Sequence, residues 1–395
     1  MSFGTKEYRE RIKKTKEKMA LQGIEVLLIS DPANIYYLSG YDSWSFYAIQ
    51  VLIIISDEDE PIWIGHEQEI GKVNATSWLY YENVISYSNE YIASNVKHPM
   101  NFISEILDQI GQSKRTIGAE LYNYYFTFKC YQLLKKGLPT ATFKDASFLV
   151  STIRIIKSNT EIEYMRHAAI IGEKAMVRGI NSININTRSF DILDNVVQTQ
   201  VNGAKDLEGN YSFISPALSS SRKAHRQHLT SITDEYLQGD TIILEVSGSY
   251  KRYYSSITRT INLGKPSERM QLLSDISSEG LNKCIEMIKP GVNYQEVEET
   301  WRKTIKKNGF CNEINFGSSI GLNYPPNFGK SIPSIGKQDN IIIEPNMTFH
   351  FTPCIWLGNE RFETSESVLV TDTRCEPFIS LEKNLFIKEE QVFIN

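Results

Sequence analysis

Hydrophobic and polar positions in the first part of the chain change period in a way that predicts helices and strands in turn. Charged residues between Tyr8 and Gly23 are interrupted by Ile12, Met19 and Leu21, a spacing that favours an amphipathic helix ending at the glycine. The apolar run 24–29 follows, and Ser30-Asp31-Pro32 closes it with a turn signal. This run therefore predicts a buried strand.

The same alternation continues to about residue 136. In chain order, it predicts strands over 51–56 and 61–64 joined by the acidic turn 57–60, a helix over 102–110, a strand over 116–119 and a helix over 124–136. Helices that alternate with strands favour an α/β domain with a mixed sheet.

A boundary between two domains is indicated after this pattern ends. The segment 137–146 contains glycine and proline and is largely polar, so we expect domains at 1–150 and 151–395. Ser158 with Glu161 three residues later forms the sequence signature of a capping box. A long helix is therefore expected to open the second domain.

Composition supports an ordinary two-domain globular protein. The chain has 395 residues, of which 41% are hydrophobic and 23% charged, with a formal net charge of -5, and this length is more than one core usually organises. Lysine and arginine are spread without a basic block, so no surface for nucleic acid or anionic membrane is indicated. A small molecule is the expected partner.

The N-terminus and the cysteines bear on cellular location. The first residues are charged and lack the apolar segment of a signal peptide, and apolar runs such as 51–55 have the length of a strand. The five cysteines are odd in number and show no paired spacing typical of zinc or redox sites. We expect a cytoplasmic protein with free thiols.

Strings in the second half of the chain occur in a characteristic order. They are GDTIILE at 239–245, SITRT at 256–260, GSSIGL at 317–322, MTFHFTP at 347–353 and ESVLV at 366–370, preceded by RIIKSNTEIEYM at 154–165. In order and spacing they resemble the creatinase, methionine aminopeptidase and prolidase superfamily. The resemblance implies an α/β (α+β) protein, with an N-terminal creatinase-like mixed-sheet domain followed by a C-terminal pita-bread domain.

The resemblance also identifies the positions that hold metals in this superfamily. Its metallopeptidases bind two divalent ions through two aspartates, a histidine and two glutamates, and the corresponding residues here are Glu245, Ser256, Ser318, Thr352 and Glu366. Two such ions need several anionic oxygens and a nitrogen donor. Because only two of the five residues are acids, we expect neither a metal nor another cofactor.

Other strings are similar to the ectoine hydrolases, namely DPANIYYLSGYDSWSFY at 31–47, EVSGSYKRY at 245–253, IGLNYPP at 320–326 and MTFHF at 347–351. This similarity implies a zwitterionic cyclic amidine as substrate, opened to N-acetyl-2,4-diaminobutyrate. Creatinase fits less well, because its glutamate before the Arg-Thr pair is Thr258 here. A creatinase-like amidinohydrolase, an Xaa-Pro peptidase-like protein and an inactive ligand-binding protein remain alternatives.

The predicted catalytic residues follow from this resemblance and from their chemistry. His228 occupies the place of the catalytic histidine of creatinase and is expected to act as general acid and base. Glu245 and Glu366 are expected to hold the amidinium, unless one of them attacks it directly. His350, between two phenylalanines on a probable strand, is either a second active-site donor or a buried core histidine.

The predicted substrate-binding residues are aromatic or cationic. Trp44, Phe46, Tyr47 and Tyr324 offer ring faces to a cation, although Phe46 and Tyr47 could instead pack in a core. Arg252 is a candidate for the substrate carboxylate. The resemblance further implies a homodimer in which the N-terminal domain of one subunit closes the active site of the other, so Trp44 is expected to reach the partner.

Overall fold

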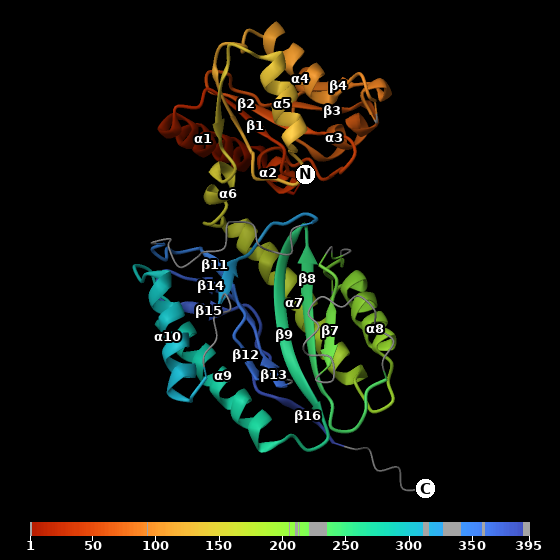
Figure 1. Ribbon diagram of the computed structural model, residues 1–395, viewed down its shortest axis with the longest axis vertical. Coiled ribbons are helices and arrows are strands. Elements are labelled where there is room, and N and C mark those ends of the chain that lie inside the picture. Colours follow the sequence, from red (N-terminus) through yellow and green to blue (C-terminus); the bar gives the residue numbers. More distant parts are fainter. Residues whose placement is uncertain are drawn as a thin grey trace. The chain divides into compact units, whose positions relative to one another are not determined.

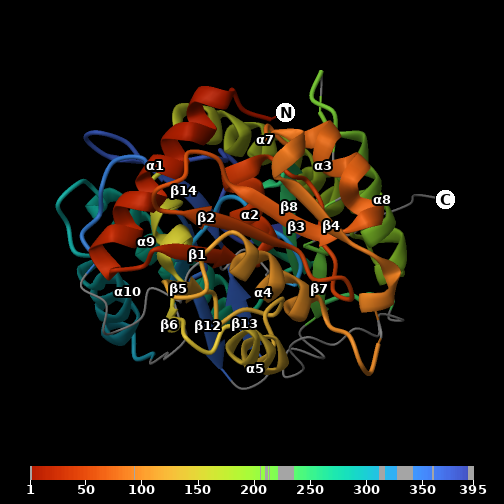
Figure 2. The same ribbon diagram turned by 90° about the horizontal axis from the view of Figure 1, so that it is seen from above.

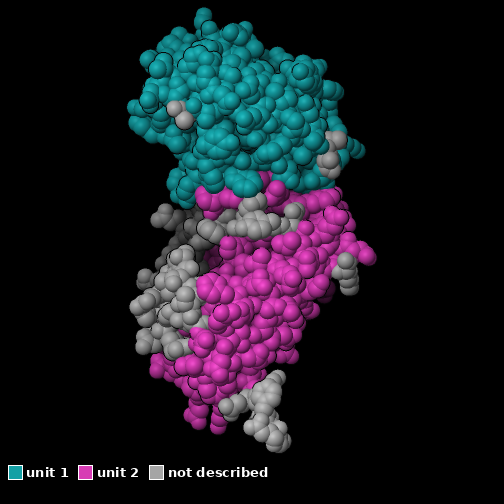
Figure 3. Space-filling view, turned by 90° about the vertical axis from the view of Figure 1, so that its right-hand side faces the viewer, with its two compact units in different colours: residues 1–154 teal, residues 155–395 magenta. Residues whose placement is uncertain are grey.

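The computed structural model describes residues 2–92, 94–204, 206–209, 212, 214–220, 235–310, 316–326, 341–357 and 360–389. The chain forms two compact units, residues 1–154 and 155–395 (Figure 3). Among the described residues, no helix combines the length and the apolar character needed to cross a membrane.

Unit 1 is built on a six-stranded sheet with the order β4-β3-β2-β1-β5-β6. Its strands are β1 Val26–Ile29, β2 Val51–Ile55, β3 Ile62–His66, β4 Val84–Tyr87, β5 Thr116–Ala119 and β6 Thr142–Asp145. β2 runs antiparallel to both β1 and β3, whereas the remaining pairs are parallel. The predicted mixed sheet is therefore confirmed.

The helices of unit 1 cover this sheet. They are α1 Thr5–Gln22, α2 Pro32–Ser39, α3 Ile70–Thr76, α4 Pro99–Gln109, α5 Phe128–Gly137 and α6 Leu149–Ile153, with short 3-10 helices at Glu67–Glu69, Tyr81–Asn83 and Asn89–Tyr91. α4 and α5 lie side by side (Figures 1 and 2). Their apolar residues, among them Ile103 and Leu134, pack with Val26, Ile53 and Ile117 of the sheet.

Two elements of unit 1 differ from the sequence prediction because of capping. The predicted turn at 30–32 is the start of α2, where the Asp31 side chain accepts hydrogen bonds from Ala33 N at 2.8 Å and Asn34 N at 3.3 Å, and proline suits the first helical turn. The helix predicted over 124–136 begins at Phe128, because the Thr127 hydroxyl accepts from Cys130 N at 3.3 Å.

Unit 2 contains two four-stranded sheets and a hairpin. One sheet has the order β16-β9-β8-β7 and the other β10-β11-β14-β15, and β12 pairs with β13. The strands are β7 Ala217–Ser220, β8 Thr241–Tyr250, β9 Tyr253–Leu263, β10 Gly317–Ser319, β11 Thr348–Phe351, β12 Cys354–Leu357, β13 Glu360–Glu363, β14 Glu366–Val370, β15 Cys375–Pro377 and β16 Phe386–Lys388.

Helices cover one face of each sheet in unit 2. They are α7 Asn159–Ser182, α8 Ser189–Asn202, α9 Glu268–Met287 and α10 Tyr294–Lys307 (Figure 1). The predicted capping box of α7 is confirmed, with Ser158 and Glu161 each accepting from the other's backbone N–H. α7 and α8 pack on β8 and β9, and α9 and α10 pack on β11 and β14. β9 also contacts β14. The faces of these two strands that the helices do not cover carry polar side chains.

Candidate functional site

Hydroxyl groups line the face of β8 and β9 that the helices leave free. Ser247 pairs with Ser256 across the two strands, and their Oγ atoms lie 2.5 Å apart. Glu245 pairs with Thr258 two positions further along. Because side chains two residues apart on a strand share a face, the partly exposed Glu245 lies beside this serine pair.

Two direct links join this face to β14. The Ser367 hydroxyl accepts from Ser256 N at 3.0 Å and donates to Ser256 O at 2.7 Å. The backbone N of Ser365 donates to Thr258 O at 3.1 Å. Strands from the two sheets therefore form one continuous polar surface.

His350 on β11 completes the surface. It pairs with Ser318 on β10 and with Ser367 on β14, and its Nε2 lies 2.8 Å from Ser365 Oγ. Burial lowers the pKa of His350 to about 4, with repulsion from Arg259 acting in the same direction. The imidazole is therefore neutral near pH 7. We call this surface the site face, and its residues are Glu245, Ser247, Ser256, Thr258, Ser318, His350, Ser365 and Ser367.

Glu366 does not lie on the site face, which corrects the role expected from the sequence. It pairs with Phe351, so strand alternation directs it to the opposite side, where Phe351 packs beneath α9 and α10. Its side chain has 0% exposure, and its Oε1 accepts from Arg259 Nη2. Burial raises the pKa of Glu366, while the Arg259 guanidinium opposes the rise. This geometry does not fit a residue that contacts substrate.

Arg259 is the centre of a buried network behind the site face. Besides Glu366, it donates to Thr258 O at 2.9 Å and Ser365 O at 2.7 Å. It also donates to Leu381 O at 2.7 Å and Glu382 O at 2.5 Å. These contacts tie β9 to β14 and to the segment after β15.

The residues present do not fit a two-metal centre. Ser256, Ser318 and Thr352 offer neutral hydroxyls, and among the described residues of the site face Glu245 is the carboxylate. In the part of the chain that the structure describes, no group of three or more histidine, cysteine, aspartate or glutamate residues is placed to hold a metal ion. Two divalent ions sharing a site require several anionic oxygens, and this donor set lacks them.

Arg252 and Tyr324 are brought together beyond the end of β8. The Arg252 guanidinium lies 5.2 Å from the centre of the Tyr324 ring, and Tyr324 is 2% exposed. β8 ends at Tyr250, five residues after Glu245, which corresponds to about 17 Å along the strand. Arg252 lies two residues beyond this end. The ring predicted to receive a substrate cation therefore already contacts an arginine.

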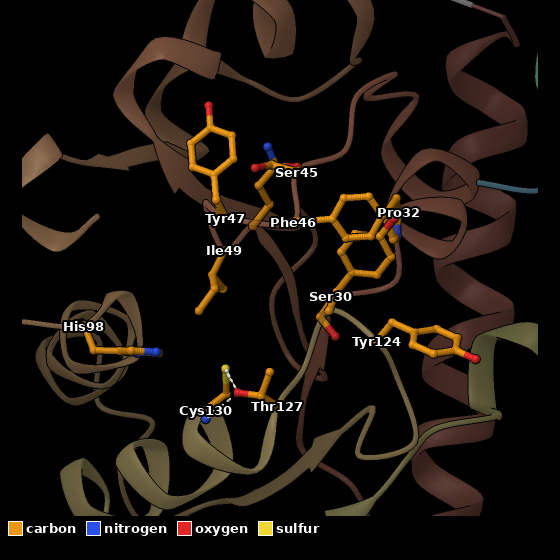
Figure 4. Close-up of a pocket in the computed structure, with 12 residues that line it drawn as sticks. Ser30, Pro32, Ser45, Phe46, Tyr47, Ile49, His98, Tyr124, Thr127 and Cys130 are labelled. Carbon is orange, nitrogen blue, oxygen red and sulfur yellow. Dashed lines mark hydrogen bonds between the residues drawn. The ribbon is translucent and has the colours of Figure 1, made fainter. Parts of the chain in front are cut away.

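The aromatic residues predicted in unit 1 lie at its surface. Phe46 and Tyr47 are 63% and 71% exposed, so core packing does not explain them, and Trp44 is partly buried. Phe46 stacks on Tyr125 with ring centres 5.2 Å apart. Phe46 and Tyr47 line a cavity of about 220 Å³ that also contacts His98 (Figure 4).

One predicted site residue lies outside the described part of the chain, and three residues of the site face were not predicted. His228 lies outside the described residues. Ser247, Ser365 and Ser367 were missed, although the alternation of small polar residues in the string Thr364-Ser365-Glu366-Ser367 carries a signal for a strand with one hydroxyl face.

Comparison with known proteins identifies the family. The Creatinase/Prolidase N-terminal domain matches residues 11–156, and Metallopeptidase family M24 matches residues 163–372. The chain is 34% identical over 395 residues to the ectoine hydrolase of Halomonas elongata, covering 98% of this chain and 99% of that protein. It is 33% identical over 390 residues to an uncharacterized hydrolase/peptidase of Sinorhizobium fredii, again covering 98% and 99%.

Solved structures confirm the predicted fold class. The crystal structure of a dipeptidase from Pyrococcus horikoshii OT3 matches with a TM-score of 0.80 at 22% identity, covering 96% of this chain and 100% of that one. The family match over 163–372 spans the site face. The protein therefore belongs to metallopeptidase family M24, with a creatinase/prolidase N-terminal domain preceding the pita-bread domain.

Proposed function

We propose that this protein is a metal-independent hydrolase that opens a cyclic amidine, with ectoine as substrate and N-acetyl-2,4-diaminobutyrate as product. The observation that carries the proposal is the site face, on which hydroxyl groups stand at positions where the metallopeptidases hold metal ligands. The 34% identity to an ectoine hydrolase over nearly the whole chain supports the choice of substrate.

The charge of the site face suits an amidinium ion. An amidinium carries one delocalised positive charge and N–H groups, and Glu245 supplies one carboxylate that can accept two of them. Ser247 and Ser256 bond to each other and add no charge. Thr258 Oγ1 is buried and, among the described residues, has no hydrogen-bond partner, so it can bond to a ligand beside Glu245.

Hydrolysis requires an oxygen to add to the amidine carbon and a proton to reach the nitrogen that leaves. We assign His228 to this proton transfer, as its place in the sequence suggests. Two routes are open to Glu245. It can hold the cation while water attacks. Alternatively, it can attack the amidine carbon itself, so that the ring C–N bond breaks and leaves an acyl imidate on the glutamate, which water hydrolyses to the N-acetyl product and the free carboxylate. Rapidly quenched enzyme would carry the mass of the bound substrate only on the second route.

The exposed rings of unit 1 support a shared active site. Phe46 and Tyr47 present apolar surface to solvent, and Trp44 lies two residues before Phe46. We propose that in a homodimer these aromatic side chains close the active site of the partner subunit over the substrate cation.

The test is incubation of the purified protein with ectoine, hydroxyectoine, creatine and Xaa-Pro dipeptides, with products identified by mass spectrometry in the presence and absence of a chelator. We expect chelator-resistant conversion of ectoine or hydroxyectoine, lost in Glu245→Gln and in His228→Ala. Cleavage of dipeptides that depends on added divalent metal would overturn the proposal. Ligand binding without any turnover would instead indicate an inactive member of the family.

A further inference from the structure

We propose that Ser365 is a positioning residue that fixes His350 as the neutral tautomer with its proton on Nδ1, so that His350 presents an N–H donor to the site face. The tautomer follows from the contacts of the two side chains alone. Only the identity of the group that receives this hydrogen bond depends on the proposed function.

The side chains of His350 and Ser365 form a hydrogen bond with each other. The contact of 2.8 Å between His350 Nε2 and Ser365 Oγ is, within the described ranges, the only hydrogen bond that either side chain makes. The backbone of Ser365 is fixed on both sides, because its N donates to Thr258 O at 3.1 Å and its O accepts from Arg259 Nη1 at 2.7 Å. These contacts fix the position of the Ser365 backbone, and among the described residues the His350 ring is the group that its hydroxyl reaches.

Counting protons decides which atom donates. Ser365 is 0% exposed, so its hydroxyl proton has no access to solvent. If Nε2 donated to Oγ, the hydroxyl proton would be buried without an acceptor, a loss that lowers stability by about 1–3 kcal/mol. If the hydroxyl donates to Nε2, the proton that solvent cannot reach is paired, and the unpaired proton is the one on Nδ1 of His350, which retains 8% exposure. Nε2 is then the acceptor, and the proton of a neutral imidazole must be on Nδ1.

The surroundings also keep the ring from gaining a second proton. His350 is buried, and the Arg259 guanidinium behind the site face repels an imidazolium, so its pKa falls to about 4. Glu366 faces away from His350 and pairs with Arg259, and therefore does not supply a compensating carboxylate. The neutral tautomer is thus the form present near pH 7.

A donor on the same surface as Glu245 defines what the site face recognises. Nδ1 of His350 has no hydrogen-bond partner among the described residues, and the residue retains 8% exposure. Glu245 offers an acceptor for N–H groups, whereas His350 offers a donor for an oxygen. That oxygen belongs either to the substrate carboxylate, which is charged before and during the reaction, or to the group added at the amidine carbon. The added oxygen gains negative charge as the new C–O bond forms.

The tautomer is tested in the ligand-free protein by the two-bond ¹H–¹⁵N correlations of ¹⁵N-histidine-labelled enzyme at pH 7. His350→Gln identifies the His350 signals among the six histidines. We expect the Nδ1-protonated pattern in the native protein and in Ser365→Thr, and a mixture of tautomers in Ser365→Ala. An Nε2-protonated ring in the native protein, or an unchanged pattern in Ser365→Ala, would overturn the proposal.

Turnover of the amidine then tests the role of the donor. We expect Ser365→Ala to lose about 10²-fold in kcat/KM, a loss typical of a misplaced active-site donor, with Ser365→Thr restoring most of it. Ser255→Ala, which removes a buried hydroxyl one position from Ser256, is the matched control and should retain activity. A loss confined to KM assigns the oxygen to the substrate carboxylate, and a loss in kcat assigns it to the oxygen that forms during reaction.

The two arms separate this inference from the proposed function. If the native protein converts no amidine while the spectra show the expected tautomer, the proposed function fails and the positioning role of Ser365 stands. If Ser365→Ala scrambles the tautomer yet keeps full turnover of ectoine, the donor role of His350 is wrong and the proposed function stands.

Discussion

The substitution Glu366→Gln tests whether Glu366 supports the fold from behind the site face or works within it. In the native protein the carboxylate is 0% exposed and pairs with Arg259, which is equally buried. Glutamine keeps the shape and an oxygen acceptor but removes the negative charge. The guanidinium then loses its ion pair with residue 366 but keeps its hydrogen bonds to four backbone carbonyl groups, those of Thr258, Ser365, Leu381 and Glu382.

The expected loss of stability follows from those contacts. Removing one partner of a buried ion pair typically costs about 3–5 kcal/mol, because the remaining charge is uncompensated. Four carbonyl groups still solvate Arg259, and the glutamine oxygen can still accept, so we expect the lower value of about 3 kcal/mol. For a unit of this size that corresponds to a fall of roughly 6–12 °C in the unfolding temperature.

Calorimetry of the native protein and the variant measures this change, and ectoine turnover at 25 °C measures the effect on the site. We expect a lower unfolding temperature for unit 2 with kcat/KM within about threefold of native, because Glu366 does not face the substrate. Glu376→Gln is the control. Its ion pair with Arg374 is exposed and should contribute less than about 1 kcal/mol. An unchanged unfolding temperature together with abolished turnover would refute the placement of Glu366 behind the site.

Three further outcomes are expected. Glu245→Gln should bind ectoine at least tenfold more weakly in calorimetric titration, and unchanged affinity would remove Glu245 from the cation site. Since the pKa of His350 falls from 6.5 to about 4 in the folded protein, its neutral form stabilises the fold above pH 6.5, and about 3 kcal/mol of that stability should be lost as pH falls towards 4. His350→Gln should flatten this part of the stability curve, and an equally steep curve in the variant would show that another group causes it. Mixing inactive Trp44→Ala with inactive Glu245→Gln should restore about a quarter of native turnover if each active site combines two subunits, whereas no recovery from verified mixed dimers would mean that each subunit is self-sufficient.

Much of the fold could be predicted because its signals are local. The apolar run of β1, the glycine that ends α1 and the capping box of Ser158 and Glu161 act over a few residues, so the sequence alone indicates them. The presence of hydroxyl residues at positions where the metallopeptidases hold metal ligands was equally readable. It depends on which residue types are present, and no folding can turn the hydroxyls of Ser256, Ser318 and Thr352 into carboxylates.

The composition of the site face, in contrast, was decided by the tertiary structure. Glu366 was predicted to contact substrate and Ser365 was overlooked, because a difference of one residue along a strand reverses which side chain faces the cleft. Only the pairing of β14 with β11 and its contacts with β9 place Ser365 beside His350 and Glu366 beside Arg259. Likewise, the contact between Arg252 and Tyr324 joins residues from separate strings. The sequence by itself determined which chemical groups are available, whereas long-range strand pairing determined which of them share one surface, because that choice depends on partners distant along the chain.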